Sequence, residues 1–389
     1  MQPRLIILLT AVASLAFSGR PAAAGTIYYQ ITDLGALPPS YPASQGLAIS
    51  SNGQVAGVAY NASGTYQSQA FLYSGGAIKG LGALPGDVDS VVGGVNASGQ
   101  VAGSSSVTST STPHAFLYSG GVLTPLGTFP GGVGSNASGI NTSGQISGSA
   151  SFNFEGSLEE HAFLYSGGVM KDLGTLTNGV NSEGAGINAS GEVTGWSSTT
   201  GGEDHAFLYN GSVMKDLGTL PLGLESFGAA VNSIGQVTGY GLTSSNQANA
   251  FLYSGSSMQS LGTLPGDTFS YGTGINDSGQ VVGYSGAGGE VVNHAFLYSN
   301  FTMTDLNSLI SPSSGWVLEY AEGINNAGQI TGYGIFDDQI VAYLLTPTPE
   351  PSTLVLAGLG CAGLFGYGRR RKLAATSFRS NERCKRSPK

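Results

Sequence analysis

Hydrophobic and polar positions follow one another in the same order seven times along this chain. A clear copy has a polar turn inside Ile275–Gly283, and the apolar run His294–Tyr298 follows it after a loop. The turn glycines lie 44 to 49 residues apart, at Gly53, Gly99, Gly144, Gly191, Gly235, Gly279 and Gly328. A period of this length indicates either a four-stranded propeller blade or a helical repeat.

Residue types favour strands over helices. The chain has 63 glycines among 389 residues and only 10 % charged residues, which is a poor composition for helices. The tetrad Asn276–Gly279 is typical of a tight turn between two strands. The run Ala295–Tyr298 is apolar at consecutive positions, which predicts a strand covered on both faces.

Each copy therefore predicts four strands. In the copy above they are Ser270–Ile275, Gln280–Tyr284, His294–Tyr298 and Met303–Leu306. The first strand is rich in small residues, such as Gly272, Thr273 and Gly274. We expect it beside a crowded central axis, where large side chains do not fit.

The two ends of the repeat region complement each other. The last copy predicts three strands, Tyr320–Ile324, Gln329–Tyr333 and Ile340–Leu345, and then stops at Pro347. The missing fourth strand has its counterpart at Tyr28–Gly35, which matches the fourth-strand pattern of Val169–Gly174. The sequence thus predicts an all-β, seven-bladed propeller over residues 25–346, whose N-terminal strand closes the last blade. An open β-solenoid is the alternative.

Both ends of the chain predict targeting segments. Residues 1–24 have an early Arg4, an apolar run and a small-residue exit at Ala22–Ala24, the pattern of a secretory signal peptide. Residues 347–372 begin with Pro349, Glu350 and Pro351, continue with the apolar stretch Leu354–Gly368 and end in a basic cluster. That cluster is Arg369, Arg370, Arg371 and Lys372. This arrangement predicts a short membrane span with a cytoplasmic C-terminal end, followed by a basic extension at 373–389.

Two resemblances follow from these motifs. The tail resembles the PEP-CTERM sorting signal, and the tripeptides at His114, His161, His205 and His294 resemble the HAF family of extracellular repeats. The first resemblance implies export and cutting near Pro-Glu-Pro by an exosortase-type enzyme. It also implies release or attachment at the outer surface, often beside exopolysaccharide, with membrane contact only through the uncut tail. The extension 373–389 departs from the family pattern, in which tails end soon after the basic cluster.

Charge and cysteine content narrow the partners. Residues 25–348 contain 21 Asp and Glu against three lysines, Lys79, Lys171 and Lys215, and 3 − 21 gives a net charge of −18. Such a surface repels nucleic acid and favours cations or cationic partners. Both cysteines, Cys361 and Cys384, lie in the tail, so no disulfide is predicted within the repeats.

Candidate chemistry is sparse. The four histidines begin third strands on separate blades, so we expect a structural hydrogen bond for each and no shared metal site. Acidic residues in loops offer oxygens to calcium, but they lack the spacing of a dedicated calcium loop. They are Asp87, Asp89, Glu159, Glu160, Glu203, Asp204, Asp267, Asp337 and Asp338. The sequence predicts no catalytic, cofactor-binding or metal-binding residue, with calcium at these loops as an open alternative.

Two classes of function remain. Regular copies favour a non-catalytic surface or matrix module that binds exopolysaccharide or a surface protein. The alternative is an extracellular polysaccharide hydrolase or lyase on a propeller scaffold, for which we expect a long charged insertion. The longest irregular segments, Ser104–Pro113, Ala150–Glu160 and Asn307–Leu318, are modest and mostly uncharged. Regularity therefore argues against catalysis.

Overall fold

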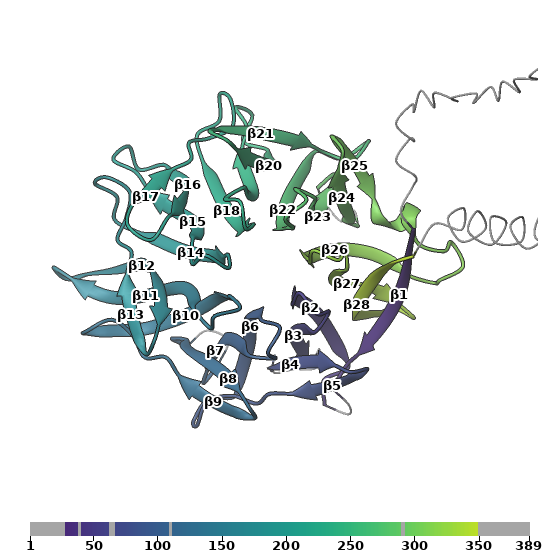
Figure 1. Cartoon of the computed structure of the whole chain (residues 1–389), viewed down its shortest axis with the longest axis horizontal. Helices are drawn as coiled ribbons and strands as arrows, with labels where there is room; N and C mark the ends of the chain where they lie inside the picture. Colours follow the sequence, from purple (N-terminus) through teal and green to yellow (C-terminus); the bar gives the residue numbers. More distant parts are fainter. Residues whose placement is uncertain (1–27, 38–39, 62–66, 109–110, 289–291, 349–389) are drawn as a thin grey trace, which may run out of the picture. The chain divides into compact units, whose positions relative to one another are not determined.

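The computed structural model describes residues 28–37, 40–61, 67–108, 111–288 and 292–348. These residues form seven four-stranded antiparallel sheets set around a central axis (Figure 1). The prediction of an all-β, seven-bladed propeller is confirmed, and the open solenoid is wrong. The predicted signal peptide, the tail beyond Thr348 and the extension 373–389 lie outside the described residues.

The strands fall into four concentric sets (Figure 1). The inner strands are β2 (Ala43–Ile49), β6 (Asp89–Val95), β10 (Gly132–Ile140), β14 (Ser182–Ile187), β18 (Ser226–Val231), β22 (Phe269–Ile275) and β26 (Val317–Ile324). The second strands are β3 (Val55–Tyr60), β7 (Val101–Ser106), β11 (Ile146–Phe154), β15 (Val193–Ser198), β19 (Val237–Leu242), β23 (Val281–Gly286) and β27 (Ile330–Phe336). The third strands are β4 (Ser68–Ser74), β8 (His114–Ser119), β12 (Ser157–Ser166), β16 (Asp204–Tyr209), β20 (Ala248–Ser254), β24 (His294–Ser299) and β28 (Gln339–Thr348). The outer strands are β5 (Ala77–Gly80), β9 (Val122–Pro125), β13 (Val169–Asp172), β17 (Met214–Asp216), β21 (Ser257–Gly262), β25 (Thr302–Asp305) and β1 (Tyr28–Gly35).

The N-terminal strand closes the ring as predicted. The last sheet has the order β1-β28-β27-β26, and β1 pairs with β28 from Tyr28 opposite Thr348 to Thr32 opposite Leu344. Strands at the two ends of the described region therefore pair across more than 300 residues of sequence, and each sheet formed by the described residues has four strands. Pairing continues to Thr348, two residues beyond the predicted boundary at 346.

Each sheet is built around a buried aromatic ring on its third strand. These rings have no exposed surface and belong to Phe71, Phe116, Phe163, Phe207, Phe251, Phe296 and Tyr343. In the sixth sheet Phe296 lies opposite Gly283 of β23. A Cβ atom at Gly283 would stand 1.9 Å from the Tyr271 carbonyl oxygen and 2.9 Å from Phe296 Cζ. The second-strand glycine is thus required by the aromatic residue of the next strand.

Serine hydroxyls tie neighbouring sheets together. Ser182 Oγ accepts a hydrogen bond from Ala162 N at 2.9 Å and donates one to Gly174 O at 2.6 Å, so it joins β14 to the third sheet. The equivalent serine accepts from the preceding third strand at six sheet boundaries. These serines are Ser44, Ser90, Ser135, Ser182, Ser226 and Ser270. The hydroxyls satisfy N–H groups that the short outer strands leave without a partner.

The boundary between the sixth and seventh sheets lacks this serine. Leu318 occupies the serine position in β26, and its N–H donates to Asn307 Oδ1 at 2.7 Å. Asn307 belongs to the 3-10 helix η1 (Leu306–Leu309), so the predicted irregular segment Asn307–Leu318 begins in a helical turn. The predicted fourth strand Met303–Leu306 correspondingly ends at Asp305, whose side chain caps that turn.

Two further expectations need correction. The segment Ala150–Glu160 is mostly regular, because β11 and β12 extend into a hairpin around Glu155 and Gly156, both of which have positive φ. Neighbouring inner strands do converge, since a Cβ at Gly93 would stand 2.2 Å from Ala137 O and one at Gly274 3.1 Å from Gly323 Cα, but large side chains are not excluded from the axis. A Cβ at Gly272 would meet Thr238 Oγ1 of the neighbouring sheet at 2.4 Å, whereas Leu47 and Glu322 fit at the axis itself.

Candidate functional site: the axial channel

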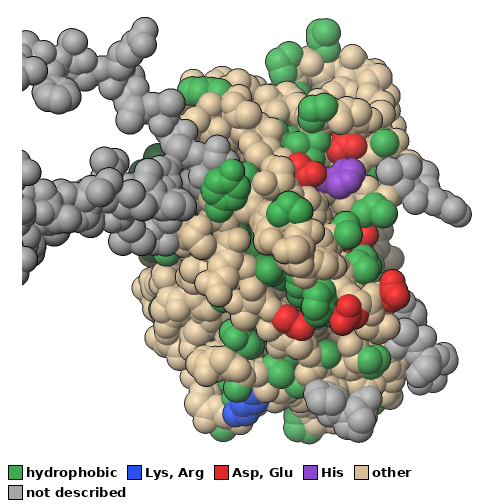
Figure 2. Space-filling view, turned by 90° about the vertical axis from the view of Figure 1, so that its right-hand side faces the viewer, with side chains coloured by type: hydrophobic (Ala, Val, Ile, Leu, Met, Phe, Trp, Pro, Cys, Tyr) green, Lys and Arg blue, Asp and Glu red, His purple; other side chains and the backbone are tan. Residues whose placement is uncertain are grey.

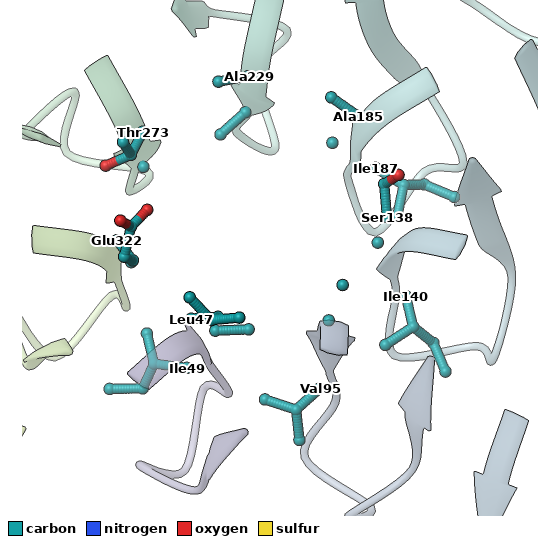
Figure 3. Close-up of a pocket in the computed structure, with 18 of the residues that line it drawn as sticks. Leu47, Ile49, Val95, Ser138, Ile140, Ala185, Ile187, Ala229, Thr273 and Glu322 are labelled. Atoms are coloured by element: carbon teal, nitrogen blue, oxygen red, sulfur yellow. The ribbon is translucent and has the colours of Figure 1, made fainter. Parts of the chain in front are cut away.

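A channel runs along the axis between the seven inner strands (Figure 3). Each inner strand has a β-bulge, and the residues skipped by the pairing line the channel. One such residue from each sheet forms what we call the bulge ring: Leu47, Gly93, Ser138, Ala185, Ala229, Thr273 and Glu322. The cavity inside this ring measures about 390 Å³. That volume lies in the range of small-molecule sites.

Branched aliphatic side chains line the next level of the channel. They stand two residues after the bulge ring and form the aliphatic girdle: Ile49, Val95, Ile140, Ile187, Val231, Ile275 and Ile324. A second hollow of about 210 Å³ lies at the hairpin-turn end and shares Ile49, Ile275 and Ile324 with the first. The girdle therefore separates the two hollows with apolar surface.

An asparagine belt lies at the turn end of the channel. Asn276 Oδ1 accepts from the N–H groups of Ser278 and Gln280 in its own turn, and Asn276 Nδ2 donates to Asn325 O of the next sheet. The same link runs from sheet to sheet through Asn96, Asn141, Asn188, Asn232, Asn276 and Asn325. Asn325 reaches the first sheet by donating to Ser50 O at 3.0 Å, and Asn52 Nδ2 instead bridges the first and second sheets by donating to Ala97 O. The turn motif thus also joins neighbouring sheets.

Glu322 is the ionisable residue of the bulge ring. It sits on β26 and points into the channel beside Thr273 (Figure 3). Part of its surface faces the open channel, yet it lies deep between the inner strands, and this burial raises its pKa to about 8. A carboxyl group with this pKa is mostly protonated at neutral pH.

Aromatic rings form an arc across one part of the ring of sheets. Consecutive ring centroids lie 4.5 to 6.1 Å apart from Trp196 in the fourth sheet to Tyr333 in the seventh. The intervening rings are Phe227, Tyr240, Tyr271, Tyr284 and Tyr320. The equivalent pairs in the first three sheets are Gln45 with Val58, Val91 with Ser104 and Asn136 with Ser149. Seven-fold regularity is therefore broken by aromatic packing on one side.

The four histidines do not converge. His161 and His205 each place Nδ1 3.0 Å from a carboxylate on the outer strand of their own sheet, at Asp172 and Asp216. His114 instead faces Asp87 at 3.3 Å, in the loop that leads into its sheet. His294 Nδ1 lies 3.8 Å from Asp267 Oδ2, a buried oxygen without a hydrogen-bond partner among the described residues.

The acidic loop residues are also dispersed. Asp87 Oδ2 accepts from Ser105 Oγ at 2.6 Å, and Asp89 Oδ1 accepts from Ser68 N at 2.8 Å. Glu159 lies 4.0 Å from His161, and Glu160 helps to raise the pKa of Glu183, mainly a burial effect. Burial, with Glu225 nearby, likewise raises the pKa of Asp204, next to Glu203.

Asp337 and Asp338 form a hairpin turn with positive φ. Across the described ranges of the chain, no group of three metal-ligating side chains comes together.

The lysines are engaged away from the channel. Lys79 Nζ donates to Tyr118 Oη at 2.9 Å, and Lys215 Nζ donates to Tyr253 Oη at 2.7 Å, in each case across a sheet boundary. Lys171 makes the same contact with Tyr209. Acidic side chains are spread over the side of the ring seen in Figure 2. The net negative charge is therefore not offset near the axis.

Comparison with known families explains the C-terminal tail. Residues 347–372 match the PEP-CTERM protein-sorting motif. The tail is a sorting signal. It marks an exported surface protein that is sorted through the membrane, and it implies processing by an exosortase. Pro347 and Thr348 of the motif belong to β28 and pair with β1. The other matched residues, including Pro349 to Pro351 and Arg369 to Arg371, lie outside the described residues. Within the part of the chain that the structure describes, no helix is long and apolar enough to span a membrane.

Solved structures resemble the fold at low sequence identity. A puromycin-hydrolyzing peptidase from Mycobacterium tuberculosis is 12 % identical with a TM-score of 0.52, and the match covers 81 % of this chain and 55 % of the peptidase chain. The β-propeller domain of the Trilobed protease from Pyrococcus furiosus is 9 % identical with a TM-score of 0.46, over 68 % and 81 % of the two chains. No curated protein matches the sequence. At such identities the likeness extends to the fold alone.

Sequence reasoning missed Glu322 and the asparagine belt. A residue-by-residue alignment of the seven copies places Glu322 at a position otherwise held by Leu, Gly, Ser, Ala or Thr. A single charge in such a column is the signal that identifies the residue. The belt was predicted only as turn chemistry, because the sequence does not show which carbonyl lies beyond each asparagine amide.

Proposed function

We propose that this protein is a non-catalytic binding or structural module at the bacterial surface or in the extracellular matrix, associated with exopolysaccharide. The sorting tail supports this location, with cutting near Pro349 to Pro351 before release or attachment. The repeat copies carry the proposal further, since their similarity to HAF-type extracellular repeats agrees with an extracellular role.

The channel chemistry is the observation that carries the non-catalytic part. Most glycoside hydrolases place two carboxyl groups about 5 to 10 Å apart on either side of the scissile bond. The residues lining the main cavity provide one carboxyl group, Glu322, together with the hydroxyls of Ser138 and Thr273. Asp277 lines the second hollow, where its carboxylate already accepts from Ser233 N and Asn326 Nδ2. The groups in the main cavity can hold a ligand by a few polar contacts in a partly apolar wall, but this cavity lacks the second acid or base.

Binding and turnover are separated by one experiment. The processed protein, purified from its host, is passed over the host's immobilised exopolysaccharide, and the eluate is assayed for new reducing ends and unsaturated sugars. We expect retention without product. The same protein, denatured with acid before it is applied to the column, serves as the control for nonspecific adsorption.

Products of depolymerisation that disappear in E322Q would establish the hydrolase or lyase instead. Lack of retention on every host polysaccharide would remove the binding role and leave a structural role in the matrix.

A further inference from the structure

Glu322 is unpartnered in a cavity of ligand size. Its carboxyl group points into the channel (Figure 3), and it has no hydrogen-bonding or ionic partner among the described residues. The nearest hydroxyl in the bulge ring, Thr273 Oγ1, donates to Ala321 O at 2.6 Å and is therefore used by the backbone. A buried carboxyl group without a partner is costly unless something else supplies one.

The lining chemistry restricts what that partner is. A calcium ion takes six to eight oxygen ligands, whereas the bulge ring offers side-chain oxygens only from Ser138, Thr273 and Glu322. The other lining side chains are apolar, such as Leu47, Ile140 and Ile187, and they make up about half of the exposed lining beside polar atoms that include the backbone. A ligand with one positive charge and an apolar body matches this wall better than a bare metal ion.

The charge of the whole domain acts in the same direction. Residues 25–348 carry a net charge of −18, and each of the three lysines contacts a tyrosine on the neighbouring sheet. A protein with a net charge of one sign attracts ions of the opposite sign. Cations are thus attracted to the domain, and the three lysines, which contact tyrosines elsewhere, do not compete with them for Glu322.

We propose that the axial channel binds a small organic ammonium ion, with Glu322 as counter-ion and the aliphatic girdle in contact with its apolar body. This inference names a ligand class for the channel and rests on the proposed binding function in treating the channel as a binding site.

Proton release is a signature of this site. Before an ammonium ion binds, the carboxyl group of Glu322 holds a proton at neutral pH. Binding of R–NH3⁺ to Glu–COOH therefore gives the ion pair and one free proton. The titratable groups whose charge interacts with Glu322 are Tyr284, Tyr333 and Tyr343, and burial raises all three tyrosine pKa values, so they remain neutral. Affinity should therefore rise about tenfold per pH unit below about 8.

Calorimetric titration of the processed protein with hexylammonium chloride tests the proposal. At pH 6 and pH 7, in two buffers of different ionisation enthalpy, we expect about a tenfold affinity gain at the higher pH and release of about one proton. Hexan-1-ol, the neutral analogue, should bind at least about tenfold more weakly.

Three variants complete the test. E322Q keeps the shape of the side chain and should lose hexylammonium binding, and so should E322T, which introduces the residue of the neighbouring sheet and is compatible with the fold. E183Q alters an inner-strand carboxyl group that already accepts from Trp196 Nε1 at 3.1 Å, and it should bind as the parent does.

The inference is wrong if E322Q and E322T bind hexylammonium as tightly as the parent protein does, or if the parent binds hexan-1-ol as tightly as hexylammonium. It is also wrong if the affinity for hexylammonium falls from pH 6 to pH 7, or if no heat of binding is measured. Hexylammonium binding without retention on exopolysaccharide would instead remove the polysaccharide part of the proposed function alone.

Discussion

Asn276 serves its own hairpin and the neighbouring sheet with one side chain. Its oxygen accepts from two N–H groups of the turn, and its amide nitrogen donates to the carbonyl of Asn325 across the boundary. At the start of an inner strand, Ser182 uses one hydroxyl to join β14 to Ala162 N and Gly174 O, both of which precede that strand. Short polar side chains therefore join the sheets without adding bulk. They bond to backbone N–H and C=O groups that have no partner strand at these positions.

The glycine of the second strand should tolerate no side chain. We expect Gly283→Ala to lower the free energy of unfolding by about 3 kcal/mol, since its Cβ would overlap the Tyr271 carbonyl and the Phe296 ring. Urea denaturation measures the loss. Gly262→Ala is the control, because its Cβ meets nothing and only its positive φ costs about 1 kcal/mol. Equal losses in the two variants would contradict the overlap.

The His161–Asp172 pair should stabilise the ring over a limited pH window. A hydrogen bond with Asp172 raises the pKa of His161, against burial and with help from the Asp172 and Glu159 charges. Burial works to raise the pKa of Asp172, but hydrogen bonds from His161 and Gly174 N outweigh it and lower that pKa.

The histidine contribution is full below its unfolded pKa of about 6.5 and is lost as pH rises through the raised value. The aspartate contribution is full above about 4 and is lost as pH falls through the lowered value.

We expect His161→Gln to lose less than about 1 kcal/mol at pH 5.5, because water screens the half-exposed Asp172, and almost nothing at pH 9. Urea denaturation at both pH values checks the difference, with His161→Gln/Asp172→Asn as the reference. A loss that grows from pH 5.5 to pH 9 would show that the pair is not charged in the folded state.

Among the strands, β1 joins the N-terminal end of the ring to its C-terminal end. It is the outer strand of the last sheet, and its removal leaves β28 as an unpaired edge. The boundary between the last and first sheets resembles five others, since Ala342 N donates to Ser44 Oγ at 3.0 Å. The ring is therefore closed by strand pairing, by two side-chain hydrogen bonds, at Ser44 and at Asn325, and by apolar packing of Ala342 and Leu344 against the first sheet.

Deletion of Thr26–Gly35 should test the contribution of β1. We expect a drop in Tm of about 10 °C or more, with aggregation through the free edge of β28, as measured by scanning calorimetry and light scattering. A chain starting at Gly25 with β1 intact is the control. Identical melting of the two chains would mean that the side-chain contacts alone hold the ring closed.

At the scale of the whole molecule, the last strand of the ring, β28, overlaps the start of the sorting motif. The strand ends at Thr348, and the sorting motif begins at Pro347, so the last paired residues belong to both. A net charge of this size and sign generally favours solubility and cationic partners.

Processing should leave the ring intact. We expect the intact mass of the secreted protein to match a chain that begins near Gly25 and ends near Pro349 to Pro351. Mass spectrometry of the extracellular fraction measures both ends at once. A secreted protein that retains Cys384 would contradict cutting at the motif, and replacement of Pro349 to Pro351 by alanines is the matched control for its recognition.

Repetition made the architecture predictable. Seven copies of the turn and of the apolar third strand determine the strands, their order and the seven-fold ring, because each copy averages out local ambiguity. The complementary ends even predict closure by Tyr28–Gly35. Boundaries were less certain where local chemistry competes, as at Asp305, where a carboxylate cap starts a helical turn at the end of a strand.

The sequence by itself determined the strands, the ring, the acidic charge and the sorting tail, because each is written in short segments that repeat or stand together. Only the tertiary structure decided what meets across the sheets. Asn325 lies beside Ser50, and Glu322 shares a wall with Leu47 and Ser138, because ring closure brings together residues hundreds of positions apart. The burial that raises the pKa of Glu322 also arises only in the folded ring, because the inner strands together surround this side chain and no single repeat does so.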